Sequence, residues 1–349
     1  MSLKNMTIRE IILERWILTP GRHINLLFLA ATFAIGCEVC ERGGRVSAEQ
    51  IEGRGASGDG FCPSPDEGEL RDRLREARAH AEGDPGEGLP LVASLCHELA
   101  WDLLEEGLLS DAETLVREEL AAVRFLAAND PETFLPRVAD ACENLAGILW
   151  EGGDPAEAEP LYREALSLRR SLAGQDPAEG PLSEVASSCV DLALFLEDLG
   201  RLEEAEPLLR EALGTYRSLR GGHALSWAAM VARTGFVLAR VLDCAGRPEE
   251  AEPLLREALG CYRSLAAADP GEDGLPALIP EAGSPMCALA TILAEGGRVG
   301  EAEELFRGGL SMYAILSEAH PEREDFRLGE EAFRDGLAQL SDTTITHAS

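Results

Sequence analysis

Apolar side chains recur along most of this 349-residue chain at spacings of three and four, the period of a helix that buries one face. The clearest segment is EAEPLLREAL at residues 204–213, and it returns unchanged at residues 250–259. Taking the second residue of each such copy as its anchor, we count five repeats, in steps of 46, 47, 46 and 51 residues. The anchors are Ala112, Ala158, Ala205, Ala251 and Ala302.

A fixed pattern surrounds each anchor. Leucine lies 13 and 9 residues before it, alanine lies 12 before it, and leucine follows it at positions 3, 8 and 14. We therefore predict two amphipathic helices in each repeat, helix A before the anchor and helix B around and after it. Glycine lies five residues before every anchor, where a left-handed residue would end helix A at little cost. These glycines are Gly107, Gly153, Gly200, Gly246 and Gly297.

Prolines help to place the ends of the repeats. In four repeats a proline lies 19 residues after the anchor, and it predicts the loop between repeats. These residues are Pro131, Pro177, Pro270 and Pro321. Three other prolines fall near the start of helix B, where the loss of one backbone hydrogen bond is limited: Pro160, Pro207 and Pro253. We predict a repeat domain over residues 69–340, with a capping helix before the repeats and a closing helix after them, followed by a disordered tail at 341–349.

The N-terminal part has a different composition. Residues 24–36 form an apolar run that is too short to cross a bilayer comfortably but suits the core of a signal peptide. Cys37 follows directly, as in a bacterial lipoprotein signal, and is the candidate for lipidation. We therefore expect residues 1–37 to be a signal peptide or short membrane anchor, residues 38–68 to be a flexible tether, and the protein to be membrane-anchored and extracytoplasmic. An uncleaved anchor, or a cytoplasmic protein whose N-terminus is not exported, remains open.

The charge balance narrows the class of partner. The formal net charge is −32, from 63 acidic and 31 basic residues, and this excludes nucleic acid as an expected ligand because such binding needs cationic side chains. A membrane contact is expected only through the N-terminal segment. Basic peptides or proteins are favoured electrostatically, although the charge also serves solubility, and the sequence does not separate the two roles.

Residue types that carry chemistry are present without the spacings that chemistry needs. Cys96, Cys142 and Cys189 share one position of helix A, which indicates small buried core residues. The six histidines form no metal-ligand spacing, and there is no phosphate loop or nucleophile motif. We expect no metal, no cofactor and no enzymatic activity.

The pattern resembles the tetratricopeptide repeat over roughly residues 90–321. The small residues Ala146 and Ala158, the aromatic residue at Tyr162 and the later small residue Ala165 match those of the family. The long repeat, with EAEPLYREAL and ENLAGILW, is similar to that of kinesin light chains and their bacterial relatives. The resemblance implies an all-α fold, a right-handed α-solenoid of about five helix-turn-helix repeats with capping helices.

The resemblance also implies that helix A lines a concave groove that binds a partner. Positions between the recurring core residues of helix A are then the groove candidates, and Asn144 matches an asparagine that commonly binds a ligand's backbone in the family. Trp101 and Trp150 are candidate apolar anchors, or else pack against a neighbouring repeat. The full set is His97, Trp101, Glu143, Asn144, Gly147, Trp150, Asp191, Leu194 and Arg240.

These observations predict a non-catalytic scaffold that binds a segment of a partner protein or peptide in the groove and is tethered to a membrane. The alternative is a cytosolic regulatory or assembly module that acts with a separate enzyme or by self-association. The oligomeric state and the identity of the partner stay open.

Overall fold

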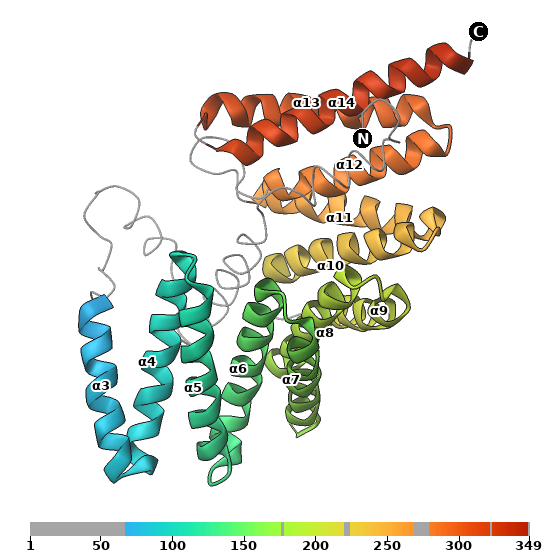
Figure 1. The fold of residues 1–349 in the computed structure, drawn as a ribbon. Helices are drawn as coiled ribbons and strands as arrows, with labels where there is room; N and C mark the ends of the chain where they lie inside the picture. Colours follow the sequence, from blue (N-terminus) through green and yellow to red (C-terminus); the bar gives the residue numbers. More distant parts are fainter. Residues whose placement is uncertain (1–66, 176–177, 220–223, 269–278, 322, 348–349) are drawn as a thin grey trace. The chain divides into compact units, whose positions relative to one another are not determined.

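The computed structural model describes residues 67–175, 178–219, 224–268, 279–321 and 323–347, and over these residues every regular element is an α-helix. The helices follow one another in pairs along the chain (Figure 1). They are α3 (Glu67–Gly83), α4 (Pro85–Glu105), α5 (Leu109–Ala127), α6 (Pro131–Gly152), α7 (Pro155–Gln175), α8 (Glu179–Asp198), α9 (Leu202–Ser218), α10 (Ala224–Cys244), α11 (Pro248–Ala268), α12 (Ile279–Glu295), α13 (Val299–Ala319) and α14 (Glu324–His347). The predicted segments at 1–37 and most of 38–68, including Cys37, lie outside the described residues.

The five predicted repeats are confirmed as the helix pairs α4–α5, α6–α7, α8–α9, α10–α11 and α12–α13. All five anchor alanines are fully buried, and so are the alanine and the leucines that recur in helix A. Only a methyl group separates the backbones at the anchor, so the two helices of a pair can cross closely. The core is therefore a series of similar interfaces between neighbouring helices, and the fold is an all-α solenoid.

The turn inside each repeat is built around the predicted glycine. Gly107, Gly153, Gly200, Gly246 and Gly297 have φ between 72° and 85°, and no other described residue has a positive φ. In the first turn the Leu108 N–H donates to the Leu103 carbonyl at 2.8 Å and the Gly107 N–H donates to the Leu104 carbonyl at 3.0 Å. These are the two bonds of a Schellman motif, and they satisfy carbonyls that helix A would otherwise leave unpaired.

Some boundaries differ from the prediction. Pro131 does not lie in a loop but opens α6, because the Asp130 side chain caps the Thr133 N–H at 3.2 Å and proline suits the first helical turn. By contrast, the prolines at 160, 207 and 253 lie inside α7, α9 and α11 as predicted, and these helices continue through them. Helix α14 extends to His347, so most of the segment expected to be a disordered tail is helical.

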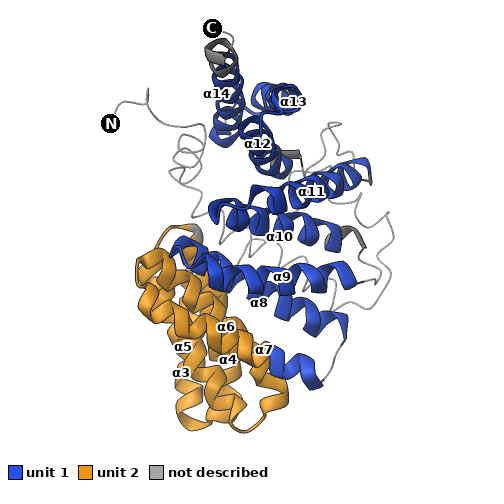
Figure 2. Ribbon diagram, turned by 90° about the vertical axis from the view of Figure 1, so that its right-hand side faces the viewer, with its two compact units in different colours: residues 1–19, 170–349 blue, residues 20–169 orange. Residues whose placement is uncertain are grey.

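The chain divides into two compact units, coloured separately in Figure 2. Of the described residues, 67–169 belong to one unit, with α3 to α6 and most of α7, and 170–347 belong to the other, with the end of α7 and α8 to α14. We refer to them as the N-terminal unit and the C-terminal unit.

The two predicted capping helices are present. In the N-terminal unit α3 packs against α4, and Arg78 of α3 pairs with Glu118 of α5. In the C-terminal unit α14 packs against α13, and glycines on both helices make room for aromatic rings. A Cβ added at Gly309 of α13 would lie 2.1 Å from the Phe333 ring, and one at Gly336 of α14 would lie 2.4 Å from the Phe306 ring. The closing helix is therefore fitted to α13 by shape as well as by hydrophobicity.

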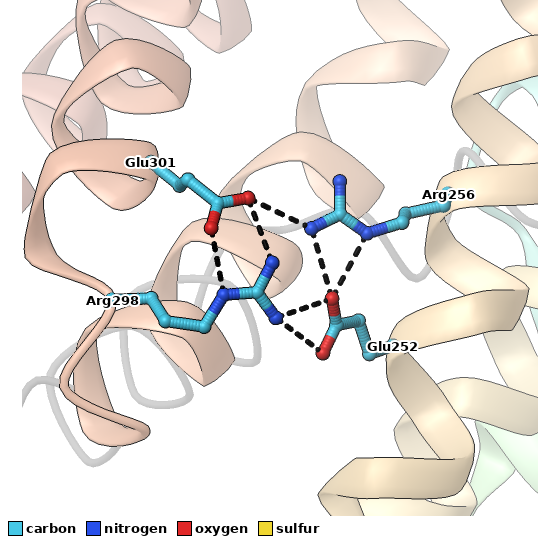
Figure 3. A network of polar contacts seen from close by, with 4 residues as sticks. All are labelled: Glu252, Arg256, Arg298 and Glu301. Carbon is cyan, nitrogen blue, oxygen red and sulfur yellow. Dashed lines mark hydrogen bonds and ion pairs between the residues drawn. The ribbon is translucent and has the colours of Figure 1, made fainter.

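Ion pairs between exposed side chains connect consecutive B helices, a feature that we did not predict. Figure 3 shows one set, in which Arg298 lies between Glu252 and Glu301 and Arg256 faces the same two carboxylates. The Arg298 guanidinium donates to each carboxylate at 2.7 Å. One repeat earlier the same arrangement is made by Glu206, Arg210, Arg247 and Glu250. A second row, further along helix B, includes Arg124–Glu164 and Arg217–Glu257, and in both rows many partners are 40 residues apart.

Candidate functional site

The predicted groove residues all lie on A helices, between the buried positions. His97 and Trp101 are on α4, and Glu143, Asn144, Gly147 and Trp150 are on α6, all in the N-terminal unit. Asp191 and Leu194 on α8 and Arg240 on α10 belong to the C-terminal unit. Arg240 is exposed and the others are half-buried, so all nine stay accessible while neighbours such as Cys96 and Leu145 are buried.

Beneath His97, the N-terminal unit carries an acidic residue at a helix crossing. Glu119 of α5 lies seven residues after its anchor, where the other repeats have Ala165, Ala212, Ala258 and Gly309. The side chain of Glu119 is only 4% exposed, and its carboxylate lies 3.3 Å from Nδ1 of His97. Nε2 of the same imidazole accepts a hydrogen bond from the Trp101 indole N–H at 2.9 Å. The three side chains therefore form a chain of contacts from buried Glu119 on α5 to half-buried Trp101 on α4.

The surroundings of His97 favour its charged form. Burial of the ring opposes protonation, but the hydrogen bond to Glu119 and the charges of Glu119 and Asp140 outweigh burial and the nearby Arg137, so the pKa of His97 is raised above its ordinary value. His97 therefore takes up its second proton at a higher pH than an exposed histidine does.

A second buried charge lies in the next repeat. Arg169 of α7 occupies the position, eleven residues after the anchor, that is tyrosine in the three following repeats (Tyr216, Tyr262 and Tyr313). Its side chain is 7% exposed, and its guanidinium pairs with Asp140 and, at 3.3 Å, with Glu143 of α6. Burying a guanidinium is costly unless it is paired, so the two carboxylates and Arg169 depend on one another.

The contacts of His97 and the ion pairs of Arg169 are connected between α4 and α6. Arg137 of α6 donates to Ser94 of α4 at 3.4 Å, and Asp140 acts electrostatically on His97. We call the set His97, Trp101, Glu119, Asp140, Glu143 and Arg169 the polar network. The sequence pattern missed Glu119 and Arg169. The available signal was that Glu119 stands where three other repeats have alanine, and Arg169 where three other repeats have tyrosine.

In the C-terminal unit, the predicted residue Arg240 is already engaged. Its guanidinium donates to Glu197 of α8 at 2.9 Å and lies 5.7 Å from the centre of the Phe236 ring. Arg240 therefore connects two consecutive A helices and is less available to a ligand than its exposure alone indicates.

The cysteines of helix A are core residues, as predicted. Cys96, Cys142 and Cys189 are fully buried, and burial raises the pKa of each thiol to about 12. A thiol in this state carries almost no thiolate near neutral pH and is a poor nucleophile.

Within the described ranges, no three or more histidine, cysteine, aspartate or glutamate side chains are grouped so that they could hold a metal ion. None of the described helices is both long and apolar enough to span a membrane.

The helix pairs and their closing glycine turns define the chain as an α-solenoid repeat protein. Models of the tetratricopeptide repeat match residues 138–179 and 184–264, and the chain is a tetratricopeptide repeat protein. No curated protein matches the sequence.

The chain is similar to solved structures of other proteins. The structure of BtubC (BKLC) from P. vanneervenii is 21% identical, with a TM-score of 0.56, over 72% of this chain and 91% of that chain. A Podosopora anserina protein with nearly identical TPR-like repeats of kinesin light chain type is 22% identical over 64% of this chain and 94% of its own, with a TM-score of 0.47. At these identities the likeness concerns the fold alone. As a tetratricopeptide repeat protein, the chain has the architecture of a protein–protein interaction scaffold.

Proposed function

We propose that the protein binds an extended, basic segment of a partner protein on the A-helix face of the N-terminal unit. This docking face consists of Trp101 on α4 and of Glu143, Asn144, Gly147 and Trp150 on α6. The two tryptophans would supply apolar contact area, and Asn144 would pair with the backbone of the bound segment.

The polar network, which shares Trp101 and Glu143 with this face, carries the proposal. The shared core pattern gives no packing reason for a glutamate where three other repeats have alanine, or for an arginine where three other repeats have tyrosine, and both replacements bury charge. Departures from a local rule that cost stability are expected where function requires them. Glu119 and Arg169 contact His97, Asp140 and Glu143, which are on or directly beside the docking face.

The charge of the chain supports a basic partner. The formal net charge of −32 creates a negative potential that attracts cationic segments and speeds their association. Glu143 contributes a carboxylate to the docking face, 3.3 Å from the Arg169 guanidinium that also pairs with Asp140.

The experiment compares short labelled peptides that share leucine anchors and are arginine-rich, uncharged or glutamate-rich. Fluorescence anisotropy should show tightest binding of the arginine-rich peptide, and Asn144→Ala combined with Trp150→Ala should abolish it while circular dichroism stays unchanged. Glu304→Ala, an exposed change on α13, is the control and should bind like the wild type. Equal binding of all three peptides, or binding that survives the double substitution, would show that the docking face is assigned wrongly.

We further propose that the chain is attached to a membrane through a lipid on Cys37, which the apolar run before it supports. The intact mass of the protein from native membranes should begin at Cys37 and include the lipid, and Cys37→Ser should move the protein to the soluble fraction. An unmodified, full-length mass would contradict the attachment.

A further inference from the structure

The hydrogen bonds of His97 fix the form of its ring. The Trp101 indole N–H is a donor only, so the Nε2 that it meets at 2.9 Å must carry no proton. The proton of the neutral imidazole is then on Nδ1, which faces the Glu119 carboxylate at 3.3 Å. Trp101 is therefore held by the neutral ring in one tautomer.

Protonation changes one of these contacts and keeps the other. A second proton would be added at Nε2, where it would point at the indole N–H, so the bond to Trp101 would be lost. The Nδ1 contact would at the same time become an ion pair with Glu119, which holds the ring in place. The protonated histidine thus stays in its position while Trp101 loses its partner there.

The neighbouring charges favour this change at a higher pH than in an exposed histidine. The groups that act on His97 are Glu119 on α5, and Asp140 and Arg137 on α6. The two carboxylates favour the protonated ring and Arg137 opposes it, with a net rise of the pKa of His97. Because Glu119 is almost fully buried, its contact with His97 is screened only weakly by salt.

We propose that His97 acts as a pH switch on the docking face, holding Trp101 in place when neutral and releasing both Trp101 and the bound segment when protonated. This rests on the proposed function. Two effects act in the same direction: Trp101 loses the contact that preorganises it, and the face gains a positive charge that repels a basic segment. The partner is bound at higher pH and released on acidification, with a midpoint above the ordinary histidine pKa of about 6.5.

The switch can be measured first without any partner. The indole N–H signal of Trp101, assigned by its absence in Trp101→Phe, is followed by ¹⁵N NMR from about pH 5 to about pH 9, the range in which histidine titrates. In the wild type this signal should shift with pH around a single midpoint. The shift should be absent in His97→Gln and should remain in His80→Gln, a control on the exposed face of α3. Glutamine keeps a neutral acceptor for Trp101 and takes up no proton in this range. A Trp101 signal that does not titrate, or that titrates equally in His97→Gln, would overturn the proposal.

The second measurement repeats the anisotropy assay with the arginine-rich peptide over the same pH range. Wild type should lose affinity about tenfold on acidification through the midpoint seen by NMR, as one proton coupled to binding allows. His97→Gln should bind with a much flatter pH dependence. The same pH dependence in both proteins would overturn the switch. A peptide that binds at no pH, with the NMR titration intact, would instead overturn the proposed function.

Discussion

Single residues of this chain are best understood by their position within the repeat. Ala165, Ala212 and Ala258 stand where Glu119 stands in the first repeat, and the tyrosines that follow stand where Arg169 stands in the second. The sequence pattern predicted which positions are buried, because the period of the helix decides that. It did not predict that two of these positions hold charges, since the partners of a buried charge come from a different helix.

Removing the guanidinium of Arg169 should take away a cation that both Asp140 and Glu143 contact. We expect Arg169→Ala to lower the free energy of unfolding by about 3 kcal/mol, the usual cost of breaking a buried pair. Arg307→Ala removes an exposed pair with Glu303 on α13 and should leave stability nearly unchanged. Urea unfolding of both variants measures the difference, and equal losses would mean that burial does not set the value of the Arg169 pairs.

At the scale of the element, the glycine turns were the most accurate part of the prediction. A glycine at one fixed distance before each anchor can be recognised from sequence, and the backbone geometry that favours it depends only on neighbouring residues. The helix starts were less accurate. Pro131 opens α6 because Asp130 caps it, and a proline after a helix reads equally well as a loop or as the start of the next helix.

Two glycines of the third repeat allow the cost of a left-handed backbone to be compared with the effect of helix propensity. Gly200 has φ +72° and Gly214 lies inside α9, and neither has an atom within 4 Å of an added Cβ. Gly200→Ala should cost about 1 kcal/mol because alanine is strained in the left-handed region. Gly214→Ala should raise stability by up to about 1 kcal/mol, since alanine is the better helix former. Thermal unfolding of the two variants gives the comparison, and shifts of the same sign would contradict it.

The ion pairs between B helices predict how stability depends on pH. The hydrogen bond from Arg298, together with Arg256 and in spite of slight burial, lowers the pKa of Glu252, so its contribution is present above the ordinary carboxyl pKa and is lost as the pH falls through the lowered value. Glu252→Gln should therefore lower the thermal midpoint at neutral pH and should approach wild type in acid or in high salt. A difference from wild type that is independent of both pH and salt would show that the pairing does not contribute.

At the scale of the whole molecule, a solenoid is stabilised by contacts between neighbouring elements. A destabilising substitution at one end should therefore loosen only the helices near it. Gly309→Ala places a methyl group against the Phe333 ring and should loosen α13 and α14. Gly308→Ala is the matched control because nothing lies within 4 Å of its added Cβ. Hydrogen exchange should speed up in α13 and α14 of the first variant while α4 to α6 keep their protection. Faster exchange throughout would contradict a nearest-neighbour description.

The presence of a closing helix could be predicted from the chain, and its fit could not. Phe326, Phe333 and Leu340 lie at helical spacing after the last repeat, which indicates an amphipathic helix. That Gly309 and Gly336 receive aromatic rings depends on how two helices lie against each other, and a single sequence does not contain that information.

The separation of 40 residues that recurs in several ion pairs between B helices bears on how such a chain can change length over evolution. Arg210 and Arg217 meet Glu250 and Glu257, each 40 residues further on. A tandem duplication of the codons for residues 205–250 would give the new copy the same arginines and the same glutamates at the same distance. Gain or loss of a whole repeat therefore leaves an arginine paired with a glutamate at each junction between repeats. The number of repeats can then change without an intermediate in which these charges are mismatched.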